Sequence, residues 1–320
     1  MMSAAACFLL FSGLVAVLGP PVLRRLTHGG LAPCLGVIAW SAATASVVLS
    51  WSMAALLLVL DIPRYRTGPG GSLLGACLAR LQASIGGADT AFEVAGVAAA
   101  TAVVSITVWI TGRLAVGLMR LRIRTHGHAR RARLIGHRVR GVDAVVIDNA
   151  ERAAYCAAGR PHAVVITTAA LAALDARQVQ AVLAHERAHL AGHHAQILAV
   201  LRVLAASLPG MTLFTAGAVE VGRLLEMCAD DSAARVHGSS TLLSGLIALC
   251  APAQVPDGAL GAGNIALLDR AGRLASPPRP AEKVRVRLLT AAVVAAVTVT
   301  PLALAALEVT GTMWCLPMTS

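Results

Sequence analysis

The chain has 320 residues, of which 57% are apolar and only 13% are charged, and its mean hydropathy is +0.73. These values lie well outside those of ordinary soluble domains and predict an integral membrane protein that contacts a lipid bilayer. The seven cysteines form no C-x-x-C pair, so the sequence indicates neither a zinc knuckle nor a disulfide framework.

Four apolar segments are each long enough to cross about 30 Å of hydrocarbon as helices. They cover residues 3–19, 31–60, 91–112 and 288–307. No basic residue precedes the first segment and Arg24-Arg25 follow it, so we expect a membrane span and not a cleaved signal.

The connection between the second and third spans begins with the turn-rich residues 67–71. The apolar spacing that follows, at Leu74, Cys77, Leu78 and Leu81, predicts a short amphipathic helix. We interpret it as a connector that lies on the membrane surface, with a small lid or sensor as the alternative.

Arginine placement predicts the orientation in a bacterial-type plasma membrane. Nine arginines lie between positions 113 and 140, immediately after the third span. By the positive-inside rule the segment after 113 is cytoplasmic and both termini are extracytoplasmic. A nucleic-acid surface is the alternative use of these arginines. We expect no direct nucleic-acid contact, because the run adjoins a span and lacks interleaved aromatic residues.

A β-type run at Ala163–Thr167 precedes the most informative motif of the chain. It is predicted either to pair with an extended substrate as an added strand or to be an ordinary core strand. The two interpretations stay open on the sequence alone.

Residues 185–189 read HERAH, an instance of H-E-x-x-H. An apolar stripe around them, a capping box at Asp175 and Gln178, and Gly192 as a stop predict one helix over about 175–191. On that helix His185 and His189 lie one turn apart on one face, where both imidazoles can bind one metal ion.

The apolar stretch 196–221 contains the breaker Leu208-Pro209-Gly210. Each half is too short to cross a membrane, so we predict two helices that pack on the domain that carries the H-E-x-x-H motif or enter one leaflet. This arrangement keeps the residues before and after the stretch on one side of the membrane.

Glu226 and Asp230 form a later E-x-x-x-D pattern, one turn apart on a helix face. We predict that Glu226 is the third metal ligand and that Asp230 contacts the outer nitrogen of a ligand histidine. His193 is the alternative third ligand, although Gly192 interrupts the helix before it. A solvated helix face is the plain alternative for the two carboxylates.

The segments HERAHLAGHH and EMCADDSAAR, at 185–194 and 226–235, resemble the BlaR/MecR-type regulatory membrane zinc metallopeptidases. They resemble the HtpX and CAAX-type membrane peptidases more distantly, and the short gap between the segments favours the first group. The resemblance spans roughly 110–290, and within it Tyr155–Thr167 is similar to the hairpin before the zinc helix. The chain departs from the BlaR/MecR-type group in two ways. It has His193-His194 where many members have Arg-Asp, and we expect no penicillin-binding sensor domain.

The resemblance implies a mainly α integral membrane protein with about four transmembrane helices. A gluzincin-like α+β zinc peptidase domain lies between the third and the last of them. We expect a membrane region over 1–112, a cytoplasmic peptidase domain over 113–286, and a last span with a short tail over 287–320.

The expected cofactor is Zn²⁺, bound by His185, His189 and Glu226, and the expected general base is Glu186. The expected substrate is a protein or peptide, and a BlaI-like repressor is the partner that the resemblance implies.

Arg235 and His237 are both candidates for an additional oxyanion donor. Two alternative functions stay open. One is an HtpX-like peptidase for quality control of membrane proteins. The other is a non-catalytic membrane receptor or scaffold with a structural metal site.

Overall fold

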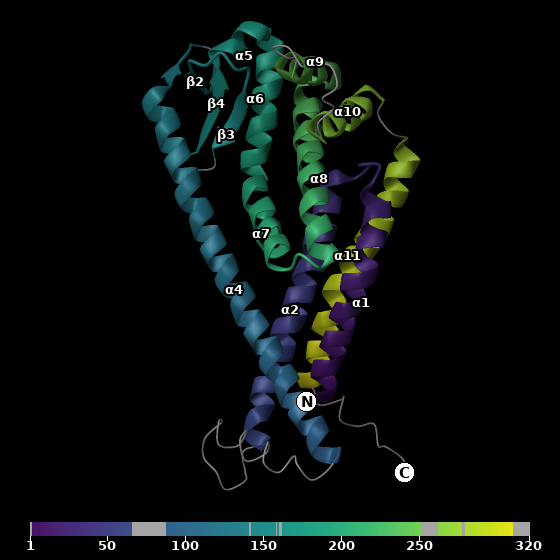
Figure 1. Cartoon of the computed structure of the whole chain (residues 1–320). Coiled ribbons are helices and arrows are strands. Elements are labelled where there is room, and N and C mark those ends of the chain that lie inside the picture. Colours follow the sequence, from purple (N-terminus) through teal and green to yellow (C-terminus); the bar gives the residue numbers. More distant parts are fainter. Residues whose placement is uncertain are drawn as a thin grey trace.

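The computed structural model describes residues 2–65, 88–140, 142–157, 159, 162–250, 262–276 and 279–309. In this part of the chain, long helices form an elongated bundle, and a small sheet with shorter helices lies at one end of it (Figure 1). The amphipathic helix predicted around Leu74–Leu81 lies outside the described residues.

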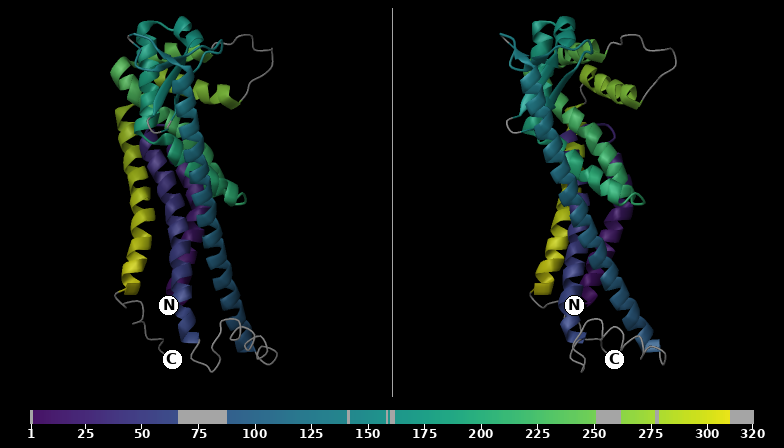
Figure 2. Two further views of the ribbon diagram at one scale, coloured as in Figure 1. Left: turned by 90° about the vertical axis from the view of Figure 1, so that its left-hand side faces the viewer. Right: turned by 60° about the vertical axis from the view of Figure 1, so that its left-hand side comes forward.

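Four long helices make up the bundle: α1 (Met2–Thr27), α2 (Pro33–Tyr65), α4 (Ala88–Ile135) and α11 (Pro280–Val309). By length and composition, each contains a stretch that is able to cross a membrane: Ala5–Thr27, Pro33–Leu57, Thr101–Ile135 and Pro280–Leu307. Each predicted apolar segment overlaps one of these stretches. The start of α1 and the end of α11 lie together, at the end of the bundle away from the sheet (Figures 1 and 2).

Helix α4 differs from the prediction in its length. The expected span stops at residue 112, whereas α4 continues without a break through the arginine-rich segment to Ile135. The reason is that leucine and arginine are both good helix formers and that no proline occurs in this segment. Residue 113, the expected start of the peptidase domain, therefore lies inside a helix.

The sheet has four strands in the order β1-β2-β4-β3. Its strands are β1 (His137–Arg138), β2 (Val145–Ile147), β3 (Ala154–Ala157) and β4 (Ala163–Thr167). β4 pairs with β2 in parallel and with β3 antiparallel, which confirms the hairpin expected over Tyr155–Thr167. All five residues of β4 are buried. β4 is therefore a core strand with both edges occupied, and its predicted pairing with a substrate is wrong.

Six further helices complete the described structure: α5 (Thr168–Ala173), α6 (Ala176–Ala191), α7 (His194–Ser207), α8 (Thr212–His237), α9 (Ser239–Cys250) and α10 (Ala262–Ala275). The break predicted at 208–210 separates α7 from α8, but α8 continues far beyond 221 and carries the E-x-x-x-D pattern. Helix α10 lies within the proline- and glycine-rich region 251–286. Prolines flank this helix and none lies inside it.

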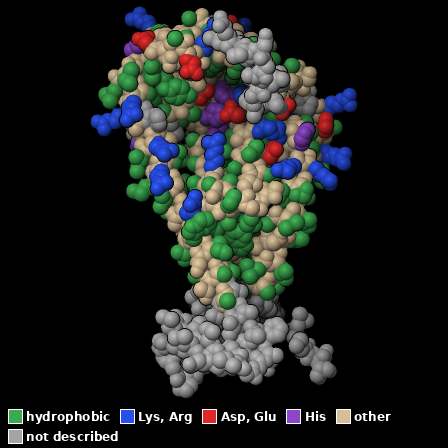
Figure 3. Space-filling model, in the orientation of Figure 1, with side chains coloured by type: hydrophobic (Ala, Val, Ile, Leu, Met, Phe, Trp, Pro, Cys, Tyr) green, Lys and Arg blue, Asp and Glu red, His purple; other side chains and the backbone are tan. Residues whose placement is uncertain are grey.

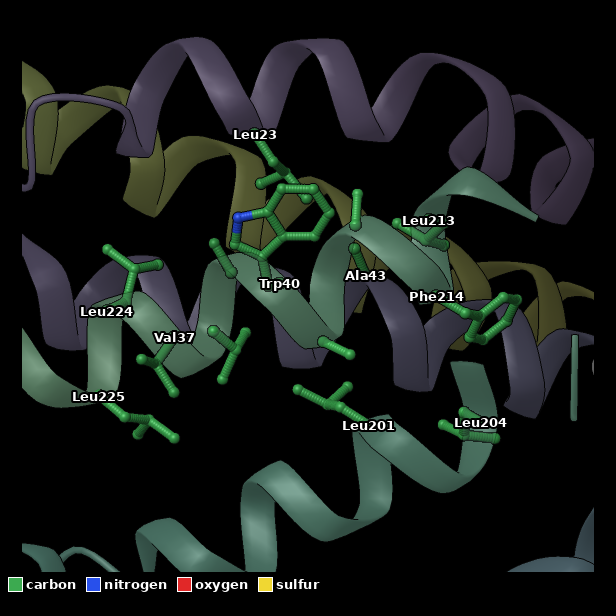
Figure 4. Close-up of a cluster of buried hydrophobic side chains, with 14 of the residues drawn as sticks. Leu23, Val37, Trp40, Ala43, Leu201, Leu204, Leu213, Phe214, Leu224 and Leu225 are labelled. Carbon is green, nitrogen blue, oxygen red and sulfur yellow. The ribbon is translucent and has the colours of Figure 1, made fainter. Parts of the chain in front are cut away.

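The largest buried cluster joins the bundle to α7 and α8 (Figure 4). Trp40 of α2 is fully buried, and a Cβ atom on Gly217 of α8 would lie only 3.2 Å from its ring. The absence of a side chain at Gly217 thus lets α8 pack closely against α2. On the face shown in Figure 3, arginine and lysine side chains lie over the upper and middle part of the molecule, and the described surface below them is largely apolar.

Candidate metal centre

Helix α6 positions the H-E-x-x-H motif. It begins after Asp175, whose carboxylate accepts hydrogen bonds from the backbone of Arg177 and Gln178, and the Gln178 side chain completes the predicted capping box. It ends at Gly192, as predicted. Val182 and Leu183 are buried against the sheet, so the face that carries His185 is turned away from the strands and toward α8.

The structure brings His185, His189 and Glu226 together. The Nε2 atoms of the two histidines lie 3.1 Å apart. The carboxylate oxygens of Glu226 lie 3.6 Å from Nε2 of His185 and 3.5 Å from Nε2 of His189. Among the described residues, these three form the one group of His, Cys, Asp or Glu side chains that is close enough to hold a metal ion.

These separations fit zinc. Four ligands at about 2.0–2.1 Å in a tetrahedron lie about 3.3–3.4 Å from one another, which is close to the three distances measured here. Two imidazoles and one carboxylate are also a donor set of catalytic zinc sites, which leave a fourth position for water. The residues present therefore fit a Zn²⁺ ion of this kind.

The outer nitrogens of both histidines have partners. Nδ1 of His185 lies 3.1 Å from Oδ1 of Asp230, a close polar contact and not a well-aligned hydrogen bond. Nδ1 of His189 lies 2.8 Å from Nδ1 of His194, the first residue of α7. Asp230 thus occupies the place predicted for it, whereas His194 was not predicted. Such partners fix the orientation of ligand imidazoles.

Arg270 of α10 is the residue that the sequence analysis missed. Its guanidinium donates two hydrogen bonds to Asp230, at 2.8 and 2.7 Å, and its third nitrogen lies 3.1 Å from Glu226. The Asp230 side chain is fully buried, and burial alone would raise the pKa of its carboxyl. The Arg270 and His185 contacts outweigh burial and lower this pKa to about 2. Arg270 therefore holds both carboxylates in place.

Glu186 lies next to the ligand group and faces β3. Burial raises the pKa of its carboxyl to about 7. His185 opposes this rise, and the Glu226 carboxylate adds to it. Cys156 of β3 lies beside it, where burial and then the Glu186 charge raise the pKa of the thiol to about 12. The candidate base is thus enclosed between α6 and an edge strand of the sheet.

Three other predicted residues do not reach this group. His193 has a left-handed backbone, with φ of 52°, and lines a cavity on the opposite side of α6 together with Arg187. Arg235 and His237 lie nine and eleven residues beyond Glu226 on the same straight helix, about 14 Å or more along its axis. The structure does not bring either of them to the ligand group, where Arg270 is the nearest cation found.

One comparison with known proteins gives a match. The family model of peptidase family M48 matches residues 123–260, which include the H-E-x-x-H motif, Glu226 and Asp230. This segment, less than half of the chain, is therefore similar to the M48 metallopeptidases, a family of zinc-dependent enzymes. No curated protein and no solved structure matches the chain. The finer resemblance to BlaR/MecR or HtpX-type peptidases stays a proposal.

Proposed function

We propose that the chain is a membrane-embedded zinc endopeptidase in which His185, His189 and Glu226 bind the metal and Glu186 is the general base. The single observation that carries this proposal is the mutual spacing of the three ligand side chains, 3.1–3.6 Å, beside the partly buried carboxylate of Glu186. The M48 match over the same residues supports it independently.

Zinc, when bound, supplies a Lewis acid that activates water and polarises a carbonyl group. The chain's own residues supply the rest. Glu186 takes a proton at its carboxylate and delivers it to the leaving amine, and enclosure between α6 and β3 limits competing contact with bulk water. Asp230 and Arg270 hold His185 and Glu226 in position.

The edge strand β3 is the surface that fits an extended substrate. One edge of β3 pairs with β4, and its other edge has no partner strand among the described residues. Cys156 places this strand directly beside Glu186. A peptide that hydrogen-bonds along β3 therefore has its backbone next to the candidate base.

The membrane location is supported by the four apolar helices, and the orientation by the arginines at 113–140. In this topology the peptidase core is cytoplasmic and both termini are extracytoplasmic. A cytosolic or membrane-proximal protein is the expected substrate class, and a repressor of the BlaI type is suggested by the sequence resemblance alone.

The test is proteolysis by the purified protein in detergent or vesicles, with a denatured model protein as substrate. The Glu186→Gln variant is expected to bind zinc at the wild-type level and to lose cleavage by about 10²–10⁴-fold, the usual contribution of a general base. Glu151→Gln is the matched control, because Glu151 is exposed and lies outside the ligand group. Normal cleavage by the Glu186→Gln variant would show that the assignment of the base is wrong.

If the metal is structural and the protein is not a peptidase, different results are expected. In that case the wild-type protein binds one zinc ion, unfolds at a lower temperature after chelation, and cleaves no substrate. Measurement of zinc content and cleavage on one sample therefore separates the enzyme from a receptor or scaffold.

A further inference from the structure

A cavity of about 1040 Å³ lies on the side of α6 that faces away from the candidate metal centre. Arg187 of α6 lines it, whereas His185 and His189 are not among its lining residues. Side chains two residues apart on a helix point about 200° apart, so Arg187 is directed away from both histidines. The other walls are the end of α4, β1, the start of β4 and the turn after α6 (Figure 1). We term this space the α4–α6 cavity, and its volume is close to the upper end of the range for small-molecule sites.

The charged groups that line the α4–α6 cavity are mostly basic. Asp143 is the one acidic side chain among its described lining residues. The basic side chains are Arg133, His137, Arg138, His162, Arg187 and His193. Three guanidinium groups against one carboxylate leave a positive charge even when all three histidines are neutral. The cavity therefore attracts anions.

The side chain of Arg133 has a hydrogen-bond donor without a partner. Its Nη2 atom is buried and makes no hydrogen bond. A buried charged donor without an acceptor is costly, so an anionic ligand that supplies an oxygen here is bound strongly. Arg133 lies in the last turn of α4, next to Ala132, which is buried against Ala163 and Val165 of β4. The backbone that carries this donor is thus fixed by the sheet.

Arg187 and His193 bring further donors from α6 and the turn after it. Arg187 donates from Nη2 to the backbone oxygen and to Oδ2 of Asp143, at 3.1 and 3.0 Å. These two bonds use one of its three nitrogens, and the Asp143 side chain is 94% exposed, so this ion pair is weak. His193 is the one non-glycine residue with a positive φ in the described part of the chain, at 52°. Strained backbone of this kind is concentrated at functional sites, which fits a binding role for the turn.

The kind of donor favours phosphate groups over other anions. A guanidinium group matches the spacing of phosphate oxygens and binds them with two parallel hydrogen bonds. Three guanidinium groups and three imidazoles offer more donors than a single carboxylate accepts. Within the described lining residues there is no Phe, Tyr or Trp side chain, so an aromatic ring of a ligand finds no stacking partner. Recognition therefore rests on the phosphate groups of the ligand.

We propose that the α4–α6 cavity binds a phosphate compound with at least two negative charges, and that Arg133, Arg138 and Arg187 hold its oxygens. A soluble phosphorylated compound and the headgroup of cardiolipin, which has two phosphates, present the same chemistry to these arginines. The site is separate from the metal ligands and does not depend on the proposed peptidase activity.

The experiment measures the binding of inorganic pyrophosphate to the full-length protein in phosphatidylcholine nanodiscs by calorimetry. Salt at about 0.15 M screens weak attraction to the basic surface. The wild-type protein is expected to bind pyrophosphate at one saturable site. Arg133→Gln is expected to weaken binding by about 10-fold or more, the loss for a hydrogen bond between charged groups. Arg138→Gln, at an exposed position where little packing is lost, is expected to weaken binding as well.

The matched control is Arg131→Gln. Arg131 is exposed on α4 and does not line the cavity, so this variant removes the same charge and should keep wild-type affinity. Absence of saturable binding by the wild-type protein overturns the proposal. So does wild-type affinity in both Arg133→Gln and Arg138→Gln, or an equal loss in Arg131→Gln.

Two further arms locate the site and its source. After zinc is removed with a chelator, pyrophosphate affinity is expected to stay the same, and binding that disappears with the zinc belongs to the metal centre and overturns the proposal. With cardiolipin in the nanodiscs, a weaker apparent affinity for pyrophosphate supports the site and identifies the lipid headgroup as its ligand. An unchanged affinity supports the site with a soluble ligand. Cleavage is not measured, so failure of the peptidase assignment leaves this test intact.

Discussion

Removal of the Arg270 guanidinium tests whether α10 holds the metal centre together. The Asp230 side chain has 0% exposure and Arg270 has 13%, and two hydrogen bonds of 2.7 and 2.8 Å join them. Loss of one partner from a buried pair costs about 3–5 kcal/mol, because the other charge stays buried. Asp230 keeps its contact with His185, so for Arg270→Leu we expect the lower end, about 3 kcal/mol.

The same variant is expected to bind zinc more weakly. Partners that orient metal ligands contribute about 10–100-fold to metal affinity, and Arg270 contacts both Asp230 and the ligand Glu226. Unfolding of the zinc-free protein in detergent, followed by circular dichroism, gives the stability change. Competition with a chromophoric chelator gives the affinity.

A double-mutant cycle isolates the interaction energy between Asp230 and Arg270. Asp230→Asn with Arg270→Leu should lose less stability than the sum of the two single variants, by about 2 kcal/mol, because neither charge is then left alone. Arg279→Leu is the control, since Arg279 is exposed and lies outside the ligand group. Strictly additive losses, or an Arg270→Leu variant with wild-type stability and zinc affinity, would refute the reasoning.

Three further outcomes are expected. Glu226→Ala should lower the zinc content per protein molecule at a fixed chelator concentration, and an unchanged content would mean that another residue is the third ligand. Leu183→Ala should cost about 2–5 kcal/mol in the free energy of unfolding, because Leu183 is fully buried between α6 and the sheet; Leu134→Ala, at a side chain 74% exposed, should cost far less. A reporter enzyme fused after Ser320 should be active only outside the cytoplasm, and cytoplasmic activity would contradict the proposed topology.

Local signals in the sequence were sufficient to predict helix α6 and the place of the H-E-x-x-H motif on it. The capping box at Asp175 and Gln178, the apolar stripe and Gly192 all lie within one short segment, and each reports on the backbone next to it. Glu226 was also predicted correctly as a neighbour of the two histidines, because E-x-x-x-D follows at a short distance.

No comparable local signal in the sequence indicates that Arg270 lies at the candidate metal centre. It lies 40 residues after Asp230, and the packing of α10 against α9, which itself packs on α8, brings the two side chains together. Prolines and glycines, which are typical of loops, dominate the sequence around α10. The sequence weakly indicates the buried position of β4. An unbroken apolar run such as AVVIT is typical of a strand buried on both faces.

The contacts of the two histidines and Glu226 tie the candidate metal centre to helices on several sides. Asp230 of α8 and His194 of α7 lie against the imidazoles, and Arg270 of α10 lies against Glu226. A displacement of α7 or α10 therefore moves a side chain of the centre even when α6 stays in place, so these helices can adjust its geometry from a distance.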